Sequence, residues 1–440
     1  MRVQFWGTRG SIAAPGPETL RYGGNTPCTA VWTDDNTLII LDCGTGARKL
    51  GLSLAKSGPL RAHLFIGHTH ADHIQGLPFF VPAFLPGSHL TIYGPAGIDR
   101  SFPQAVGGQM DYAYFPVPMH DLPARLDFEE LGEGEFMIGD VRVRTQYLNH
   151  TAPCIGYRLE ERGATLVYAT DHELHAPALW RPDRAPGRYD PEAMLHPADA
   201  RHAEFLRDAD LVIHDCQYTA AEYPAKVGWG HSTVEYAVDV SLAARARQLA
   251  LFHYDPTRSD DLVDGLVAAC RSRAAESELP LEVIGAAEGM ELTLAAGEGF
   301  TAAESGPRAP RVPTRARVLV CDDDDAIAKV LETALRRDGY EVLRAHNGAE
   351  AVKMASHQQF DLILLDVEMP EMDGFTACRT LRSDKQTESV PIVMLTARAE
   401  EENILRGFDG GATDYMTKPF AVSQVRARVR SWLTRAAAAR

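Results

Sequence analysis

The segment LFIGHTHADH, residues 64–73, is the sharpest local signal in the sequence, because an apolar run leads directly into three histidines and an aspartate. Residues two apart in an extended segment share a face, so His68 and His70 can point at one metal ion. If the chain then turns, Asp72 and His73 point toward a second metal nearby. Imidazoles and a carboxylate at this spacing suit Zn²⁺ or another borderline divalent ion. The alternative is a polar loop with surface histidines, which the preceding apolar strand disfavours.

The composition around this stretch is that of an ordinary globular protein. With 440 residues, 45% hydrophobic and 24% charged, two or three domains are expected, and wholesale disorder, collagen and coiled coil are excluded. No apolar run approaches the roughly 18 residues of a membrane span, and residues 1–15 contain no apolar signal segment. Seven dispersed cysteines without a CxxC pair fit a reducing compartment, so we expect a cytoplasmic protein. The net charge of −16 disfavours a nucleic-acid backbone as ligand.

One boundary divides the chain. Residues 295–315, AAGEGFTAAESGPRAPRVPTR, combine small residues and prolines without helical or strand periodicity, which predicts a linker. The block 1–294 before it mixes short strands with helices, and periodicity leaves a layered α/β and an α+β sandwich open. Its strands are predicted at 3–6, 28–32, 38–41, 62–66, 141–147, 155–159, 165–169 and 211–214, and its helices at 45–56, 199–208, 233–247 and 260–273.

In the block 316–435 after the linker, strand-like and helix-like segments alternate, and residues 436–440 form a short tail. Strand-like apolar runs at 318–320, 342–343, 362–365, 392–395 and 414–416 are separated by helical patterns such as 327–337. Strands that alternate with amphipathic helices favour a parallel sheet with helices on both faces.

The motif HTHADH matches the HxHxDH motif of the metallo-β-lactamase superfamily, and the block 1–294 resembles this family over nearly its whole length. The opening RVQFWGTRGSIAAPG and the later RYGGNTPC resemble its phosphodiesterase branch, which includes the RNase Z-like tRNA 3′-processing endonuclease. The resemblance implies an α/β fold, an αββα sandwich with a dinuclear metal site at one edge. Zn²⁺ is the favoured metal in both positions, and Mn²⁺ is the alternative.

The resemblance also implies the remaining metal ligands. His150 in TQYLNHTAP, Asp171 in LVYATDHE and His253 in LALFHYD each follow an apolar strand, where loops gather into sites. Any one of them alone is more often structural, but their order behind HTHADH favours ligands. The implied sharing is His68, His70 and His150 on one metal, Asp72, His73 and His253 on the other, and Asp171 bridging both.

Two further segments, LVIHDCQYT and GWGHSTVEYA, resemble the HEAT and HST segments of the phosphodiesterase branch. This implies His231 as a general acid at the leaving oxygen and Asp215 as its orienting partner, and with Asp72 these are the predicted catalytic residues. Histidine titrates near neutrality, which suits protonation of an alkoxide. Asp215 stands where Glu is usual and reaches less far. The alternative is a histidine that merely precedes a helix capped by Ser232.

Residues 317–435 resemble a CheY-like response-regulator receiver, a doubly wound domain. The resemblance rests on four segments, VLVCDDDD, LLDVEMPEMDG, MLTA and YMTKPF, each at the end of a predicted strand. Strand ends of such a sheet meet in one crevice, and clustered carboxylates suit Mg²⁺. The resemblance implies a Mg²⁺ site at Asp322, Asp323, Asp366 and Glu368, phosphorylation of Asp366, and switch residues Thr396, Lys418 and Tyr415.

Together the two resemblances imply a two-component response regulator whose output is a metal-dependent hydrolase. A phosphodiesterase for a small cyclic or linear phosphodiester is favoured, with its activity modulated by phosphorylation of Asp366. The implied partner is a sensor histidine kinase or phosphotransfer protein; nucleic acid is not favoured as substrate, no membrane contact is expected, and a homodimer stays open. One rival is a metallo-hydrolase of an ester, lactone or thioester, against which His231 argues. The other is a non-catalytic ligand-binding adaptor, against which the complete ligand set argues.

Overall fold

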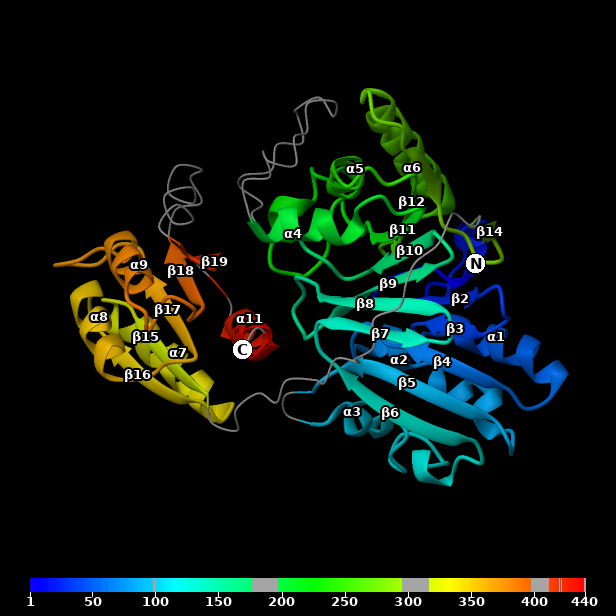
Figure 1. Cartoon of the computed structure of the whole chain (residues 1–440), viewed down its shortest axis with the longest axis horizontal. Coiled ribbons are helices and arrows are strands. Elements are labelled where there is room, and N and C mark those ends of the chain that lie inside the picture. The colour runs from blue at the N-terminus through cyan, green and yellow to red at the C-terminus, as the bar shows by residue number, and fades with distance from the viewer. Residues whose placement is uncertain are drawn as a thin grey trace. The chain divides into compact units, whose positions relative to one another are not determined.

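The computed structural model describes residues 1–97, 100–175, 197–294, 316–396, 411–418, 420 and 422–438. They fall into two compact units, one containing β1 to β14 and the other β15 to α11 (Figure 1). The predicted linker 295–315 and residues 439–440 of the predicted tail lie outside the described residues. No helix within the described ranges is long and apolar enough to cross a membrane.

The first unit is built on two seven-stranded sheets. The first sheet has the order β14-β1-β2-β3-β4-β5-β6, with strands β1 (Arg2–Gly7), β2 (Cys28–Trp32), β3 (Leu38–Leu41), β4 (Arg61–Phe65), β5 (His89–Pro95), β6 (Arg125–Leu131) and β14 (Glu291–Thr293). The second has the order β13-β12-β11-β10-β9-β8-β7, with strands β7 (Gly134–Ile138), β8 (Val141–Tyr147), β9 (Ile155–Glu161), β10 (Ala164–Ala169), β11 (Leu211–Asp215), β12 (Gln248–Phe252) and β13 (Glu282–Gly285).

The two sheets pack face to face. The ring of Phe65 on β4 lies 4.8 Å from that of Tyr157 on β9, and the ring of Phe5 on β1 lies 6.0 Å from that of Phe252 on β12. Every residue of β10 and of β11 is buried, because each strand lies inside its sheet and both faces are covered. The predicted sandwich is therefore confirmed.

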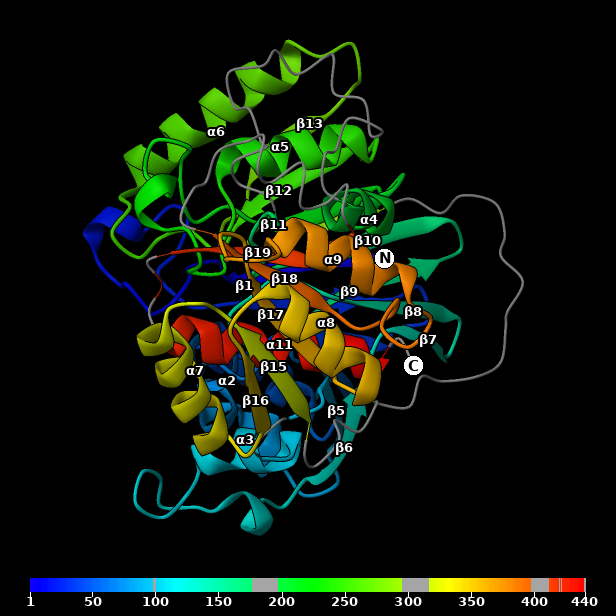
Figure 2. The same ribbon diagram turned by 90° about the vertical axis from the view of Figure 1, so that its left-hand side faces the viewer.

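Helices cover the outer faces of the sandwich (Figures 1 and 2). On the first sheet, α1 (Gly46–Leu54) contacts β1 and β2, and α3 (Phe102–Gly108) contacts β6; on the second, α5 (Val234–Ala243) contacts β11 and β12, and α6 (Asp260–Ala275) contacts β13. The helix α4 (Pro197–Leu206) packs on α5, and α2 (Ala71–Ile74) is a single turn. Short 3₁₀ helices occur at η1 (Pro17–Thr19), η2 (Ala55–Ser57), η3 (Leu77–Phe79), η4 (Val81–Phe84), η5 (Met119–Asp121) and η7 (Tyr223–Ala225).

The second unit is one parallel sheet of five strands in the order β16-β15-β17-β18-β19, as the alternating pattern predicts. Its strands are β15 (Arg317–Cys321), β16 (Glu341–Ala345), β17 (Leu362–Asp366), β18 (Ile392–Thr396) and β19 (Asp414–Thr417), and its described helices are α7 (Asp325–Arg337), α8 (Gly348–His357), α9 (Gly374–Ser383) and α11 (Val422–Ala438). One apolar core lies under α8 and α9, and a second lies under α7 and α11. Helices therefore cover both faces of the sheet.

The strands that the sequence did not predict include β6 and β7, each of which lies at one edge of its sheet. An edge strand has fewer buried positions, so its apolar signal is weak. β6 has the sequence RLDFEEL with a single fully buried residue, and β7 is likewise mostly half-buried or exposed. The helix predicted at 233–247 ends earlier, at Ala243, because Arg245 adopts a positive φ of 55°.

We predict that truncation of Trp432 unfolds the second unit more readily. Trp432 is 3% exposed, and its indole nitrogen donates to Asp414 Oδ2 at 2.8 Å, which joins α11 to β19. Trp432→Ala should cost about 3–5 kcal/mol of unfolding free energy, and Trp432→Phe about 1–3 kcal/mol from the lost hydrogen bond. Amide hydrogen exchange of β15 and β17 in the full chain measures both. Exchange rates equal to wild type in Trp432→Ala would contradict the packing described.

Candidate metal centre

The predicted metal ligands lie at the ends of strands from both sheets. His68 and His70 follow β4, His150 follows β8, and His253 follows β12. Asp72 and His73 belong to the single turn α2, and Asp171 follows β10. Because the two sheets pack face to face, these strand ends meet at one edge of the sandwich.

Backbone strain is concentrated at the same edge. Asp42, Asp171 and His253 have φ values of 59°, 60° and 61°, in the left-handed region that non-glycine residues rarely adopt. Each of the three follows the last residue of a strand by one or two positions. Strained backbone of this kind persists where surrounding contacts determine it, and it is typical of functional sites.

Six side chains form two groups that could each hold a metal ion. In one group the Nε2 atom of His150 lies 3.2 Å from Nδ1 of His70, and the rings of His68 and His70 are 4.3 Å apart. In the other group Oδ2 of Asp72 lies 3.4 Å from Nε2 of His73 and 3.2 Å from Nε2 of His253. The grouping is the one that the resemblance implies.

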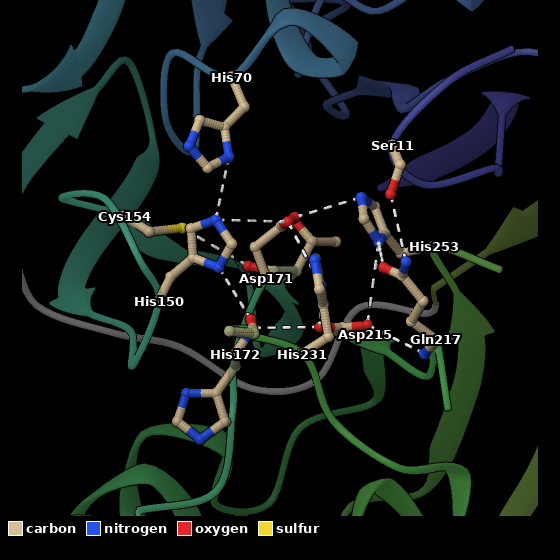
Figure 3. Close-up of polar contacts among 12 residues, drawn as sticks. Ser11, His70, His150, Cys154, Asp171, His172, Asp215, Gln217, His231 and His253 are labelled. Carbon is tan, nitrogen blue, oxygen red and sulfur yellow. Dashed lines mark hydrogen bonds and ion pairs between the residues drawn. The ribbon is translucent and has the colours of Figure 1, made fainter. Parts of the chain in front are cut away.

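The carboxylate of Asp171 lies between the two groups (Figure 3). Its Oδ1 atom is 4.0 Å from Nε2 of His68 and 3.9 Å from Nε2 of His150. Its Oδ2 atom is 3.1 Å from Nε2 of His73 and 3.5 Å from Nε2 of His253. One oxygen thus faces each group, so the carboxylate would be in reach of an ion held by either group.

The second ring nitrogen of three of these histidines has a hydrogen-bond acceptor. An acceptor at Nδ1 holds the proton there, so the lone pair of Nε2 points to the centre and can bind a metal. The pairs are His73 with Asp42 at 2.6 Å, His253 with the side-chain oxygen of Gln217 at 3.1 Å, and His150 with the carbonyl oxygen of Gly230 at 2.8 Å.

Asp42, Gln217 and Gly230 were not predicted as site residues. Asp42 also accepts hydrogen bonds from the Gly67 amide and from the Tyr168 hydroxyl, both at 2.7 Å. It directly follows the strand 38–41, the same sequence signal that selects Asp171, so the sequence could have identified it. Gly230 has a φ of +86°, and a Cβ there would lie 2.3 Å from Nδ1 of His150.

The electrostatics of the group suit divalent cations. Burial, followed by neighbouring imidazoles, lowers the pKa of His68, and burial also lowers that of His150, so both rings are neutral and available as ligands. Burial opposes charge on His73 as well, yet Asp171, Asp72 and Asp42 raise its pKa well above the ordinary value. Among the described residues, buried Nε2 of His68, Nε2 of His73 and Oδ2 of Asp171 have no hydrogen-bond partner. The neutral imidazoles of His68 and His150, the gathered carboxylates that draw positive charge to His73, and the unsatisfied ligand atoms together fit a pair of metal ions.

His231 lies beside this centre. Its Nδ1 atom is 3.0 Å from Oδ2 of Asp215 and 3.6 Å from Oδ1 of Asp171, so the aspartate reaches the histidine despite its short side chain. Burial lowers the pKa of His231, but Asp215 and then Asp171 raise it to about 9. The capping alternative is wrong: Thr233 caps α5 by accepting from the Tyr236 amide, whereas the Ser232 hydroxyl donates to the His172 carbonyl oxygen.

A third group, His172, His175 and Asp199, also has ligand atoms close together. However, Nδ1 of His172 accepts a hydrogen bond from the Asn149 amide at 3.2 Å, so the neutral ring carries its proton on Nε2. Binding a metal through Nε2 would require an imidazolate. The group is therefore better explained as a buried hydrogen-bonded network, in which Asp199 accepts from the Tyr236 hydroxyl at 3.0 Å.

In the second unit, the strand ends bring two carboxylates and a lysine together. The Lys418 ammonium donates to Oδ2 of Asp322 at 2.7 Å and lies 3.0 Å from Oδ1 of Asp366. Burial raises the pKa of Asp366 to about 6, although Lys418 opposes the shift. Of the other residues predicted for this site, Asp323 and Glu368 have exposed side chains, and Thr396 and Tyr415 are buried at the ends of β18 and in β19.

Comparison with known proteins gives two family matches and several relatives. Residues 37–254 match the model of the beta-lactamase superfamily domain, and residues 318–430 match that of the response regulator receiver domain. The DNA-binding dual master transcriptional regulator RpaA of Synechocystis is 44% identical over 119 residues, which cover 27% of this chain and 49% of RpaA. The chain thus spans about half the length of the curated relatives it matches.

Two solved structures show what each half resembles. A response regulator structure from Chloroflexus aurantiacus is 39% identical and covers 27% of this chain and 98% of its own, with a TM-score of 0.26. The short form of human tRNase Z is 19% identical and covers 67% of this chain and 100% of its own, with a TM-score of 0.45. On the family matches, residues 37–254 of this chain belong to the beta-lactamase superfamily, and residues 318–430 form a response regulator receiver domain.

Proposed function

We propose that the first unit is a metal-dependent phosphodiesterase for a small cyclic or linear phosphodiester, and that the receiver modulates it in the cytoplasm. The observation that carries the proposal is the position of Asp171, with one oxygen toward each group of ligands and the His231–Asp215 pair at its side. An alkoxide that leaves phosphorus needs a proton, which a protonated His231 can supply. The resemblance of the His231 segment to the phosphodiesterase branch favours a phosphodiester over a carboxylic ester or lactone as substrate.

The chemistry is the attack of water on phosphorus, which gives a phosphomonoester and an alcohol. Two divalent metals, when bound, supply activated water at neutral pH and offset the negative charge of the phosphodiester. His231, which Asp215 and Asp171 keep protonated, donates its proton to the leaving oxygen. Asp72 accepts a hydrogen bond from the attacking water and orients it, and the proton that this water loses passes to solvent.

Asp72 is held for this role from two sides. Its Oδ2 atom accepts a hydrogen bond from the Ser11 amide at 2.7 Å and faces His253 at 3.2 Å. Burial opposes its negative charge, but His73 and His253 lower the pKa of the carboxyl well below the ordinary value, so Asp72 is ionised. An ionised carboxylate held in this way can accept a hydrogen bond from water and orient it, but a carboxyl group with so low a pKa is too weak a base to keep a proton.

The receiver supplies the regulation. A sensor histidine kinase or phosphotransfer protein would donate a phosphoryl group to Asp366, with Mg²⁺ held by Asp322, Asp323 and Asp366 and by the carbonyl oxygen of Glu368. The buried pair of Asp322 and Asp366 fits a cation, because Lys418 is already drawn between the two carboxylates. A new dianionic group on Asp366 would compete for Lys418. Thr396 ends the neighbouring strand β18, and Tyr415 lies on β19 beyond it, so both are placed to respond.

We predict that the first unit binds about two transition-metal ions per chain and that His68→Ala and Asp171→Ala each lose metal together with activity. His68 offers a buried Nε2 with no other partner among the described residues, and Asp171 faces both groups. His120→Ala is the control, because its side chain is 83% exposed. Elemental analysis of the purified proteins measures the result. Full metal content in both the His68→Ala and the Asp171→Ala protein would show that the assignment of metal ligands is wrong.

We predict that His231→Ala keeps its metals but loses on the order of 10²–10⁴ in turnover of an alkyl phosphodiester. The loss should be smaller for bis-p-nitrophenyl phosphate, because p-nitrophenolate leaves without a proton. Steady-state kinetics with the two substrates measure the difference.

The same assay tests the substrate class. Wild type should hydrolyse the phosphodiesters and leave a lactone and nitrocefin intact. An equal loss for good and poor leaving groups in His231→Ala would count against the acid role, and preferential lactone hydrolysis by wild type would refute the phosphodiesterase.

We predict that phosphorylation of Asp366 changes hydrolysis or self-association by about 5–150-fold, the range of typical coupling free energies of 1–3 kcal/mol. Wild type and Asp366→Asn are compared, each with and without a small phosphodonor and Mg²⁺. The asparagine variant should not respond. If the phosphodonor alters neither property of wild type, the receiver does not control this hydrolase in cis.

A further inference from the structure

An exposed tryptophan stands beside the metal centre. Trp229 is 52% exposed, although large apolar side chains are usually buried. It directly precedes Gly230, whose carbonyl oxygen accepts from Nδ1 of His150, and it is two residues from His231. The backbone that carries this ring is therefore joined directly to the metal centre.

The loop that carries Trp229 is held to the same strand end as Asp171. Glu173, two residues after Asp171, is buried, and its Oε1 atom accepts from the Tyr223 hydroxyl at 2.7 Å and from the Gly228 amide at 2.6 Å. Its Oε2 atom accepts from the Gly230 amide at 2.9 Å. Hydrogen bonds to a buried carboxylate are among the stronger ones in proteins. The backbone on either side of Trp229 is thus anchored to the strand end that carries Asp171.

The cationic side chain of Lys226 lies beside Trp229. The Lys226 ammonium lies 4.1 Å from the centre of the Trp229 ring and 5.4 Å from that of Tyr218. The Tyr218 ring in turn lies 5.9 Å from the ring of His231. No ion pair joins Lys226 to a carboxylate in the part of the chain that the structure describes. Lys226 thus lies over the Trp229 ring and adds positive charge on this side of His231, while about half of the Trp229 side chain stays exposed.

We propose that Trp229 is the stacking platform for the base of a nucleotide whose phosphate lies at the metal centre, with Lys226 adding attraction for the anion. The proposal rests on the proposed phosphodiesterase function and names its substrate class: a nucleoside phosphodiester, in which a base accompanies the phosphorus. A half-exposed indole suits an aromatic base, because every base offers a π face. An alkyl or glycerol phosphodiester would leave this ring unused.

The test compares two ligands that differ by the base alone, adenosine 5′-monophosphate and ribose 5-phosphate. Their binding to the full-length protein as purified is measured by calorimetry, and their inhibition of bis-p-nitrophenyl phosphate hydrolysis is measured in parallel. Wild type should bind the nucleotide about 5–150-fold more tightly than the sugar phosphate, the range expected for stacking of one base. Trp229→Ala should remove that advantage and leave ribose 5-phosphate unchanged, whereas Trp229→Phe should keep most of it.

Tyr112→Ala is the matched control, because Tyr112 is an aromatic side chain that is 85% exposed on another loop. It should alter neither affinity. The proposal is overturned if wild type does not distinguish the two ligands, if Trp229→Ala weakens both equally, or if Tyr112→Ala weakens the nucleotide instead.

The two proposals fail separately in this experiment. Base-dependent binding through Trp229 in a protein that hydrolyses no phosphodiester would refute the phosphodiesterase and keep the nucleotide site. If the protein hydrolyses phosphodiesters but Trp229→Ala does not change nucleotide affinity, the phosphodiesterase function is kept and the nucleotide site is refuted.

Discussion

The first unit depends on one buried carboxylate, that of Asp171, which lies between two sets of imidazoles. A buried charge costs several kcal/mol unless cations and hydrogen bonds offset it. That requirement explains why strand ends from both sheets must meet at one edge, since neither sheet alone supplies enough partners. It also explains the positive φ of Asp171 and His253: the backbone accepts local strain so that these side chains point inward.

Two other buried carboxylates, Asp42 and Glu173, keep this arrangement in place. Each accepts three hydrogen bonds, Asp42 from Gly67, His73 and Tyr168, and Glu173 from Tyr223, Gly228 and Gly230. Asp42 holds the segment that carries the HTHADH motif, and Glu173 holds the loop that carries Trp229 and precedes His231. The side chains that would contact metal and substrate are therefore positioned before either arrives, which is the condition for electrostatic catalysis.

The sequence predicted most of the fold and the ligand candidates, because their signals are local: a buried strand, then a ligand-type residue at its end. Asp42 carries the same signal and was missed only because no motif accompanied it. Glu173 could not be predicted, since its hydrogen-bond partners lie 50 to 57 residues along the chain. The edge strands β6 and β7 escaped because half-exposed strands lack an apolar run. What the sequence does not show is which distant loops share a carboxylate.

The receiver domain also contains buried carboxylates that are offset by positive charge, but here the charge is on the side chain of a lysine, Lys418. Asp322 and Asp366 are both buried, and Lys418 is shared between them at 2.7 and 3.0 Å. Burial raises the pKa of Asp366, so its negative charge is poorly compensated even with Lys418 present. A phosphoryl group on Asp366 would increase that charge and draw Lys418 away from Asp322. Lys418 directly follows β19 and precedes α11, so its displacement would act on these two elements first. In the first unit the carboxylates fix a site, whereas in the receiver the proposed phosphorylation of Asp366 would make the geometry of the site depend on a covalent modification.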